Sequence, residues 1–289
     1  MASAPCPPVF PVLGSDFPSP LPAICTKTVI DVGSNNGADA RFFLQSGYCV
    51  VSVDANPTMA RKTRQAQLAT GNGEKAFALN VGLTSGERGN ATFYVNKRRP
   101  ETSSFDASKA SLLGAITRMS VPTVRCEDLW SLLCGHRPMY LKVDIEELHH
   151  VCIRALARVP TSQLPSFVSW EMHDVAEVRY PVLDVELILL LYHLGYGKMK
   201  VVTNWFSGSG TSSGGRLPDQ MVDFATNRTG WVGVDNVLIR GIGNPRAFRP
   251  ATHWDFHMRL GPLPNKTLAH WPERLRRPAV GRMEQGEVR

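Results

Sequence analysis

The stretch "VIDVGSNNGA", residues 29–38, is an apolar run that ends at Asp31 and continues into a turn with glycines at positions 33 and 37. β-Branched residues favour a strand, and glycine supplies the backbone freedom that a tight turn needs. A strand that feeds a helix through such a turn places backbone N–H groups at the carboxyl edge of a parallel sheet. The stretch therefore predicts an α/β fold with a ligand site at that edge.

The spacing of these residues is D-x-G-x-N-x-G, formed by Asp31, Gly33, Asn35 and Gly37. It lacks the middle glycine of the G-x-G-x-x-G motif, which lets a pyrophosphate approach the backbone. An NAD-dependent oxidoreductase is therefore the weaker alternative. A carboxylate at the strand end suits a ligand with an ammonium group better than one with a pyrophosphate.

A second acidic residue, Asp54, ends the next apolar run, "VVSVDANP". At the neighbouring strand end it can accept hydrogen bonds from both hydroxyls of a ribose. S-adenosylmethionine carries an ammonium, a sulfonium and a ribose without a phosphate, so it fits both acidic positions. The alternative role for Asp54 is to cap the helix expected from Pro57.

The rest of the chain alternates short β-branched runs with amphipathic stretches, which predicts parallel strands joined by helices. An added β pair is expected at residues 91–95 and 120–125, and closing strands at 195–202 and 235–239. The principal strands are predicted at residues 27–32, 48–54, 75–81, 139–144 and 166–171, and the helices at 38–46, 57–69, 127–133, 146–157 and 182–194.

Composition divides the 289 residues into three parts. Residues 1–23 hold seven prolines and no Lys or Arg, so we expect a disordered lead-in; residues 24–243 form the α/β domain. Residues 244–289 carry nine Lys and Arg against four Asp and Glu, out of a net charge of +7, and are expected to be a basic, Pro-rich tail. The domain offers no basic and aromatic strand platform, so nucleic acid is not an expected partner.

The six cysteines form no C-x-x-C pair, which predicts buried or free thiols in a reducing compartment. The longest apolar run, 187–192, is far shorter than a membrane span. We therefore expect a cytoplasmic protein without a membrane span. Three N-x-T sequons, at Asn90, Asn227 and Asn265, favour the alternative of secretory glycosylation.

The segment "YLKVDIEELHHVCIRAL", residues 140–156, places Lys142, Asp144 and Glu146 in a K-x-D-x-E pattern. With D-x-G-x-N-x-G and the acidic strand end, it resembles the FkbM-type family of S-adenosylmethionine-dependent methyltransferases. The segments "NVGLTSGERGNATFYV" (80–95), "VRCEDLW" (124–130) and "FVSWEMH" (167–173) extend the resemblance, in the family's order. It implies a Rossmann-like class I methyltransferase fold, with a mostly parallel seven-stranded sheet, helices on both faces and an antiparallel last strand.

The resemblance implies O-methylation of a hydroxyl on a small molecule or carbohydrate, with S-adenosyl-L-methionine as cofactor. Asp144, Glu171 and His173 are the catalytic candidates, with His149 as a further backup; Asp144 is either the general base or a positioning group. The three candidates show no metal-binding spacing, so no metal is expected. The expected cofactor-binding residues are Asp31, Gly33, Ser34, Asn35, Gly37, Asp54, Ala55, Asn80 and Val81.

This chain departs from the family's E-G-x-E continuation, with Glu147 in place of the glycine and His149 in place of the later glutamate. Loss of a glycine at a strand-to-helix turn removes a positive-φ option. A protein that keeps the fold and binds without catalysing is therefore the second hypothesis.

Overall fold

The computed structural model describes residues 21–86, 88–111, 114–133, 135–145, 148–172, 181–203, 232–233 and 254–260. Within these ranges the side chains of residues 171–172, 181–185, 200–203, 232–233 and 254–257 are not described.

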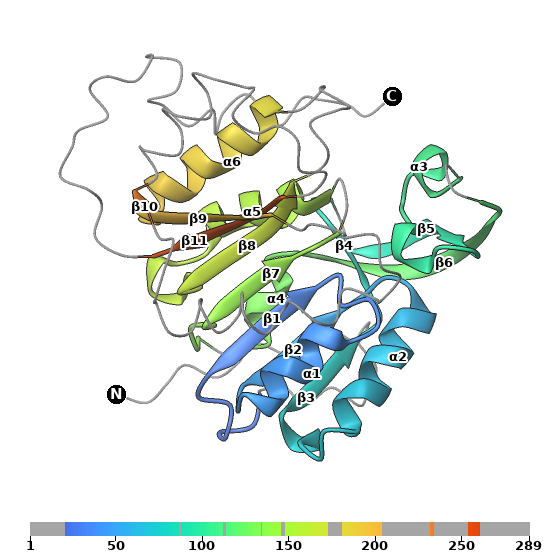
Figure 1. The fold of residues 1–289 in the computed structure, drawn as a ribbon, viewed down its shortest axis with the longest axis horizontal. Helices are drawn as coiled ribbons and strands as arrows, with labels where there is room; N and C mark the ends of the chain where they lie inside the picture. The colour runs from blue at the N-terminus through green and yellow to red at the C-terminus, as the bar shows by residue number, and fades with distance from the viewer. Residues whose placement is uncertain are drawn as a thin grey trace.

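The main sheet has eight strands in the order β10-β9-β11-β8-β7-β1-β2-β3 (Figure 1). The five strands from β8 to β3 pair in parallel, which confirms the mostly parallel sheet predicted from the sequence. Their bounds are β1 Thr28–Val32, β2 Cys49–Val53, β3 Ala76–Leu79, β7 Tyr140–Val143 and β8 Phe167–Met172. The remaining strands are β9 Lys198–Thr203, the two-residue β10 Val232–Gly233 and β11 Trp254–Arg259.

In the main sheet β10 pairs antiparallel with β9, and β11 with its two neighbours, and β11 comes from an unexpected part of the chain. β11 lies between β8 and β9 and runs antiparallel to both. It falls within the segment expected to be a C-terminal tail, so the domain reaches at least to its end rather than stopping at residue 243. The closing strand predicted at 235–239 lies outside the described residues.

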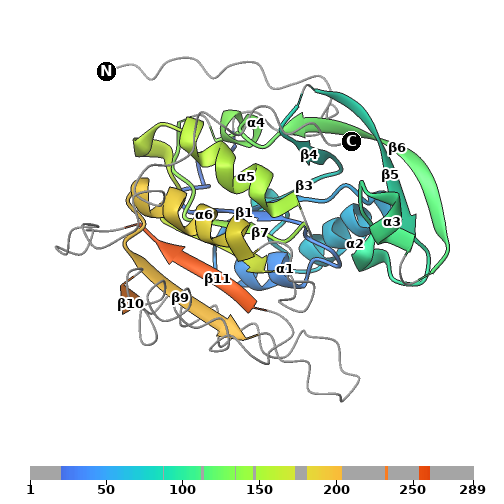
Figure 2. The same cartoon turned by 90° about the horizontal axis from the view of Figure 1, so that it is seen from above.

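Helices cover both faces of the sheet (Figure 2). On one face lie α1 Ala38–Gln45 and α2 Pro57–Leu68; on the other lie α4 Asp128–Ser131, α5 His149–Ala155 and α6 Pro181–His193. Short 3-10 turns span Gly73–Lys75, Pro100–Thr102, Leu156–Arg158 and Thr161–Gln163. The helices agree with the predicted ones, apart from shorter ends.

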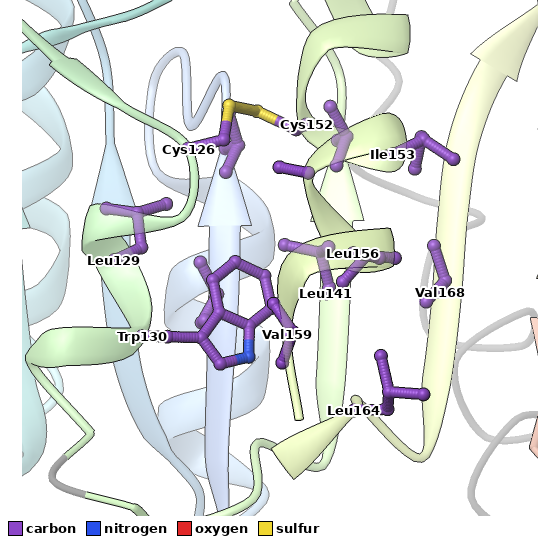
Figure 3. Close-up of a cluster of buried hydrophobic side chains, with 14 of the residues drawn as sticks. Cys126, Leu129, Trp130, Leu141, Cys152, Ile153, Leu156, Val159, Leu164 and Val168 are labelled. Atoms are coloured by element: carbon purple, nitrogen blue, oxygen red, sulfur yellow. A yellow bond between two sulfur atoms is a disulfide. The ribbon is translucent and has the colours of Figure 1, made fainter. Parts of the chain in front are cut away.

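The period-two alternation of strand side chains separates two hydrophobic clusters. Val29 of β1 packs with Phe43 of α1 and with Tyr140 of β7. Ile30 belongs to the larger cluster on the opposite face, where Trp130 of α4 and the residues of α5 fill the space over the sheet (Figure 3). The core therefore holds β1 and β7 rigidly side by side.

A second, three-stranded sheet has the order β4-β6-β5 and projects beside the main sheet (Figure 1). Its strands are β4 Gly82–Thr84, β5 Gly89–Asn96 and β6 Ile116–Arg125, and α3 Ala107–Ser111 lies between the last two. β5 and β6 pair antiparallel, which confirms the predicted β pair. The rings of Phe93 of β5 and Phe105 pack with their centroids 4.9 Å apart, so the intervening segment folds back on the hairpin.

Four of the six cysteines form two disulfides, so the prediction of free thiols is wrong for these four. Cys25 pairs with Cys49, with Cα atoms 5.3 Å apart, because β1 and β2 are parallel neighbours that start at the same level. Cys126 pairs with Cys152 of α5, with Cα atoms 5.1 Å apart (Figure 3). Spacings of 24 and 26 residues match no local motif, and only the fold brings the partners together.

None of the helices in the described part of the chain has both the length and the apolar character that a membrane crossing needs.

Each disulfide closes a loop that costs the unfolded chain entropy, so we expect it to stabilise the fold by about 3 kcal/mol. Cys25→Ala, Cys49→Ala and the double variant should then lower the free energy of unfolding by about the same amount, as urea titration measures. Equal losses show that the two residues act as one unit. Additive losses would contradict the Cys25–Cys49 bond.

Candidate functional site

The glycine turn after β1 lies between the ends of β2 and β7. The N–H groups of Gly33 and Ser34 donate to the carbonyl of Val53, at 2.8 and 3.2 Å, and the N–H of Asp144 donates to the carbonyl of Val32 at 2.9 Å. Gly33 has a φ of +79°, and a Cβ there would lie 1.8 Å from the carbonyl oxygen of Asp144. Only glycine fits this position, which accounts for the first glycine of the motif.

The same turn is attached to α2. The Ser34 hydroxyl lies 3.1 Å from that of Thr63, which donates in turn to the carbonyl of Asn35 at 3.0 Å. Gly37 has a φ of +78°, and a Cβ there would lie 2.7 Å from the Cα of Thr63. The second glycine therefore permits the close packing of α1 and α2 that keeps the turn in place.

Asp54 follows β2 directly, and its carboxylate accepts two main-chain hydrogen bonds. The N–H of Asn35 donates to Oδ2 and that of Asn56 donates to Oδ1, each at 2.8 Å. Burial raises the pKa of Asp54 to about 6, although the two hydrogen bonds lower it. The helix cap is Asn56, whose side chain accepts from Thr58, so Asp54 does not have the alternative capping role.

Asn80 lies just after β3 and supports the Asp54 turn. Its Nδ2 donates to the carbonyls of Asp54 and Ala55, at 2.9 and 3.0 Å. Val81 is buried in the main hydrophobic cluster, so its side chain belongs to the core. Of the sequence-predicted cofactor residues, Asn80 thus has a positioning contact, and Val81 has only its main chain to offer to a ligand.

Asp31 is fully buried, although it is charged in the unfolded chain. Among the described residues neither carboxylate oxygen has a hydrogen-bond partner, and the nearest cation is Nζ of Lys142, 3.8 Å from Oδ1. Burial raises the pKa of Asp31 to about 7, although Lys142 opposes the rise. A buried acid without hydrogen-bond partners is costly, which is typical of a group that serves a ligand.

Lys142 stands at the centre of an acidic cluster on the α1 face of the sheet. It pairs with Asp31 in the β1–β7 register, and its Nζ lies 2.8 Å from Asp39 of α1 and 3.1 Å from Asp144. Burial lowers the pKa of Lys142, but these three carboxylates outweigh burial and raise it well above its usual range. The cluster therefore carries one positive charge among several carboxyl groups.

Neither Asp39 nor Lys142 was among the predicted site residues. The signal for Asp39 was its place in the first turn of the helix after the glycine motif, where an acid is also expected to stabilise the helix dipole. Lys142 lay within the K-x-D-x-E pattern, but only the strand register shows that it faces Asp31.

Nothing in the described part of the chain places Glu171 or His173, the other two catalytic candidates, in this cluster. The main chain of Glu171 pairs with Asp255 of β11, and its side chain is not described. His173 and Glu146 lie outside the described residues. His149 is the buried first residue of α5, on the opposite face of the sheet from α1.

Asp31 and Asp54 lie at the same edge of the sheet. β1 and β2 are parallel neighbours, with Val32 opposite Val53. Asp31 comes directly before Val32 and Asp54 directly after Val53, so both acids lie at the carboxyl ends of adjacent strands. The site thus combines a glycine turn, one acid whose two oxygens accept hydrogen bonds from main-chain N–H groups, and one buried acid that has no hydrogen-bond partner within the described part of the chain.

The model of the methyltransferase FkbM domain matches residues 31–197, which is more than half of the chain. No curated protein sequence matches it.

Solved structures give distant similarities. An RNA methyltransferase from Salinibacter ruber with S-adenosyl-L-homocysteine has 11% identity and a TM-score of 0.27, over 50% of this chain and 65% of that one. Phosphoethanolamine N-methyltransferase 2 from Haemonchus contortus with S-adenosyl-L-methionine has 12% identity and a TM-score of 0.37, over 83% and 50%. A methyltransferase from Geobacter sulfurreducens has 11% identity and a TM-score of 0.35, over 82% and 84%. This chain spans less than two thirds of the length of the first two.

At these identities and TM-scores the solved structures carry no argument about activity, and the assignment rests on the family match together with the site. The match begins at Asp31 and includes the glycine turn, Asp54 and the Lys142 cluster. The chain therefore belongs to the FkbM family of S-adenosylmethionine-dependent methyltransferases.

Proposed function

We propose that the protein transfers a methyl group from S-adenosylmethionine to a hydroxyl of a small molecule or carbohydrate. The observation that carries the proposal is the buried Asp31 carboxylate, which has no hydrogen-bond partner among the described residues and lies two positions before Gly33. An ammonium group satisfies such a carboxylate. There is no room for a Cβ at Gly33, so the glycine lets the turn pack closely against the main chain of Asp144.

The donor-binding roles follow from the hydrogen bonds that the chain already makes. Both oxygens of Asp54 are oriented by main-chain N–H groups, and each keeps lone-pair capacity for a ribose hydroxyl. Asn80 holds the main chain on which Asp54 and Ala55 lie. Asp31 is assigned to the ammonium end, with Lys142 and Asp39 setting its position and charge.

When bound, S-adenosylmethionine supplies a methyl group activated by a positively charged sulfur. The contribution of the protein is to hold the acceptor hydroxyl in line with that methyl group at near-attack distance. Carboxylates near the site favour a cationic ligand, and the cluster around Lys142 has an excess of them.

Asp144 is assigned to positioning rather than to proton removal. Its Oδ2 lies 3.1 Å from Nζ of Lys142, and this ion pair fixes the carboxylate beside the glycine turn. Its main-chain carbonyl is the atom that Gly33 approaches. The proton acceptor is then sought beyond this cluster, and Glu171 and His173 stay predictions for that role.

The two disulfides support a compartment other than the expected one. We expected the cytoplasm because the cysteine spacing indicated thiols, but two disulfides support an oxidising compartment, where such bonds persist.

The first test is transfer of a labelled methyl group from S-adenosylmethionine to the small molecules and glycans of a cell extract. Wild type should label at least one compound, and Asp144→Ala should lose the labelling. Asp106→Ala is the matched control, because Asp106 is an exposed acid whose carboxylate accepts hydrogen bonds from Ser108 of α3. Donor binding without any labelled product would favour the non-catalytic hypothesis.

Asp144→Asn separates the two roles of this residue. A positioning role predicts weaker donor affinity with kcat reduced less than about tenfold at saturating donor, whereas loss of a general base reduces kcat by about 10² to 10⁴. Initial rates at several donor concentrations distinguish these results.

Gly33→Ala should weaken donor binding and lower the free energy of unfolding by more than 2 kcal/mol, on the order of a strained backbone plus a severe clash. Gly47→Ala is the matched control, because Gly47 also has a positive φ, +88°, but nothing lies within 4 Å of its Cβ position. Its cost should be about 1 kcal/mol, without an effect on donor affinity. Calorimetric titration and urea unfolding measure both. Equal behaviour of the two variants would contradict the close approach to Asp144.

Donor affinity should increase as the pH rises, because an ammonium binds the ionised form of Asp31, whose pKa is raised to about 7. Below that value affinity should fall about tenfold per pH unit, and Asp31→Asn should remove this dependence. Asp54, with a pKa of about 6, should add a second decrease at lower pH. Calorimetric titration at pH values below and above these two pKa values tests the prediction, and a wild-type affinity that does not depend on pH would contradict it.

The same shift predicts a pH dependence of stability without donor. The folded protein keeps the Asp31 proton over a range in which the unfolded chain, with a pKa of 3.8, has lost it. The stability of wild type relative to Asp31→Asn should therefore fall as the pH rises from about 4 to about 7, and level off above that.

A further inference from the structure

We propose that Asn90 is an N-glycosylation site and that the protein passes through a compartment where an oligosaccharide is transferred to it. The proposal is independent of the methyl acceptor. Three observations carry it: the sequon Asn90-Ala91-Thr92, its exposed position on an edge strand, and the disulfides of the same chain.

The sequon lies at the start of β5, which is an edge strand of the three-stranded sheet. Asn90 and Thr92 are both exposed and, two residues apart on a strand, point to the same face. Phe93, on the other face, is buried and packs on Phe105. The part of this face that carries Asn90 and Thr92 is thus exposed to solvent, which leaves room for a bulky glycan.

The strand partner leaves this position open as well. Asn90 lies opposite Pro122 of β6, which has no N–H to donate, and Gly89 beside it has no atom within 4 Å of its Cβ position. The backbone before the sequon is fixed, because Arg88 forms a bidentate ion pair with the buried Asp128 at 2.8 and 2.9 Å. The site is therefore exposed on an ordered part of the fold.

The disulfides supply the compartment. N-linked transfer takes place where disulfides also form, so a chain with Cys25–Cys49 and Cys126–Cys152 bonds meets both conditions. From its sequence alone an N-x-T triplet is weak evidence, since such triplets arise by chance. The combination with two disulfides and solvent exposure is what selects Asn90. The sequons at Asn227 and Asn265 lie outside the described residues.

The reaction needs a lipid-linked oligosaccharide pyrophosphate as donor. A bond forms between Nδ2 of Asn90 and the first sugar carbon, the bond from that carbon to the pyrophosphate oxygen breaks, and the lipid pyrophosphate leaves. The proton lost by the amide passes to a base of the transferring enzyme and from there to solvent. The Thr92 hydroxyl is read by the transferring enzyme, which is why a sequon accepts Ser in its place.

The test uses the full chain isolated from its source cells. Digestion with a peptide-N-glycosidase in heavy-oxygen water should convert residue 90 into a labelled Asp, which peptide mass spectrometry detects. A peptide carrying unmodified Asn90, from protein whose Cys25–Cys49 bond is intact, would overturn the proposal. Methyl transfer is assayed on the same sample, so failure of the glycan test leaves the proposed activity separately measured.

Variants expressed in a eukaryotic cell and recovered from its secretory pathway give the matched comparison. Asn90→Gln and Thr92→Ala should each lose one glycan, seen as one glycosidase-sensitive step in gel mobility, whereas Thr92→Ser should keep it. Loss of the step in both Thr92 variants, or its retention in Asn90→Gln, would overturn the assignment to this residue.

Discussion

The carbonyl oxygen of Asp144 lies where a side chain on residue 33 would have to go, and this close approach organises the site. It brings the turn after β1 against the end of β7, while the N–H groups of the turn bond to β2. Three neighbouring strand ends are thereby held together, and the acids that they carry reach one edge. The glycine does not act chemically, but the absence of its side chain lets the acidic groups converge.

This convergence is electrostatically costly, and Lys142 limits the cost. One ammonium lies among Asp31, Asp39 and Asp144, so the cluster keeps an excess of acidic groups in a largely buried place. This cost is visible in the pKa of Asp31, which burial raises to about 7. A donor that carries an ammonium, as proposed above, would give Asp31 the hydrogen-bond partner that it lacks among the described residues. On this proposal the site prefers a cationic donor over an uncharged or anionic ligand.

The two disulfides secure the elements that carry this edge. Cys25–Cys49 joins the starts of β1 and β2, and Cys126–Cys152 joins the end of β6 to α5, which follows the Asp144 turn. They constrain the scaffold at both ends of the strands without contributing a side chain to the acidic cluster. They also support the proposed oxidising compartment, with which the exposed sequon at Asn90 is consistent.

The sequence by itself predicted the main-sheet strands as far as β9 and the five principal helices in their order, because apolar periodicity and glycine turns act locally, but it did not predict β4 or α3. It also determined that Asp31 and Asp54 end neighbouring strands, since parallel strands joined by a short helix share an edge. Tertiary structure decided what depends on distant partners: Asn56 caps α2 and frees Asp54 from that role, and Lys142 faces Asp31 across the β1–β7 register.

The disulfides and the position of β11 were also decided by the tertiary structure. Residues 24 or 26 apart carry no local sign of pairing, and Trp254–Arg259 follows a basic, Pro-rich context that indicates a tail. In each case the deciding contact is made only when the sheet brings two segments side by side. Local pattern could therefore specify the elements and the acidic edge, whereas the charge balance, the covalent links and the last strand required the folded chain.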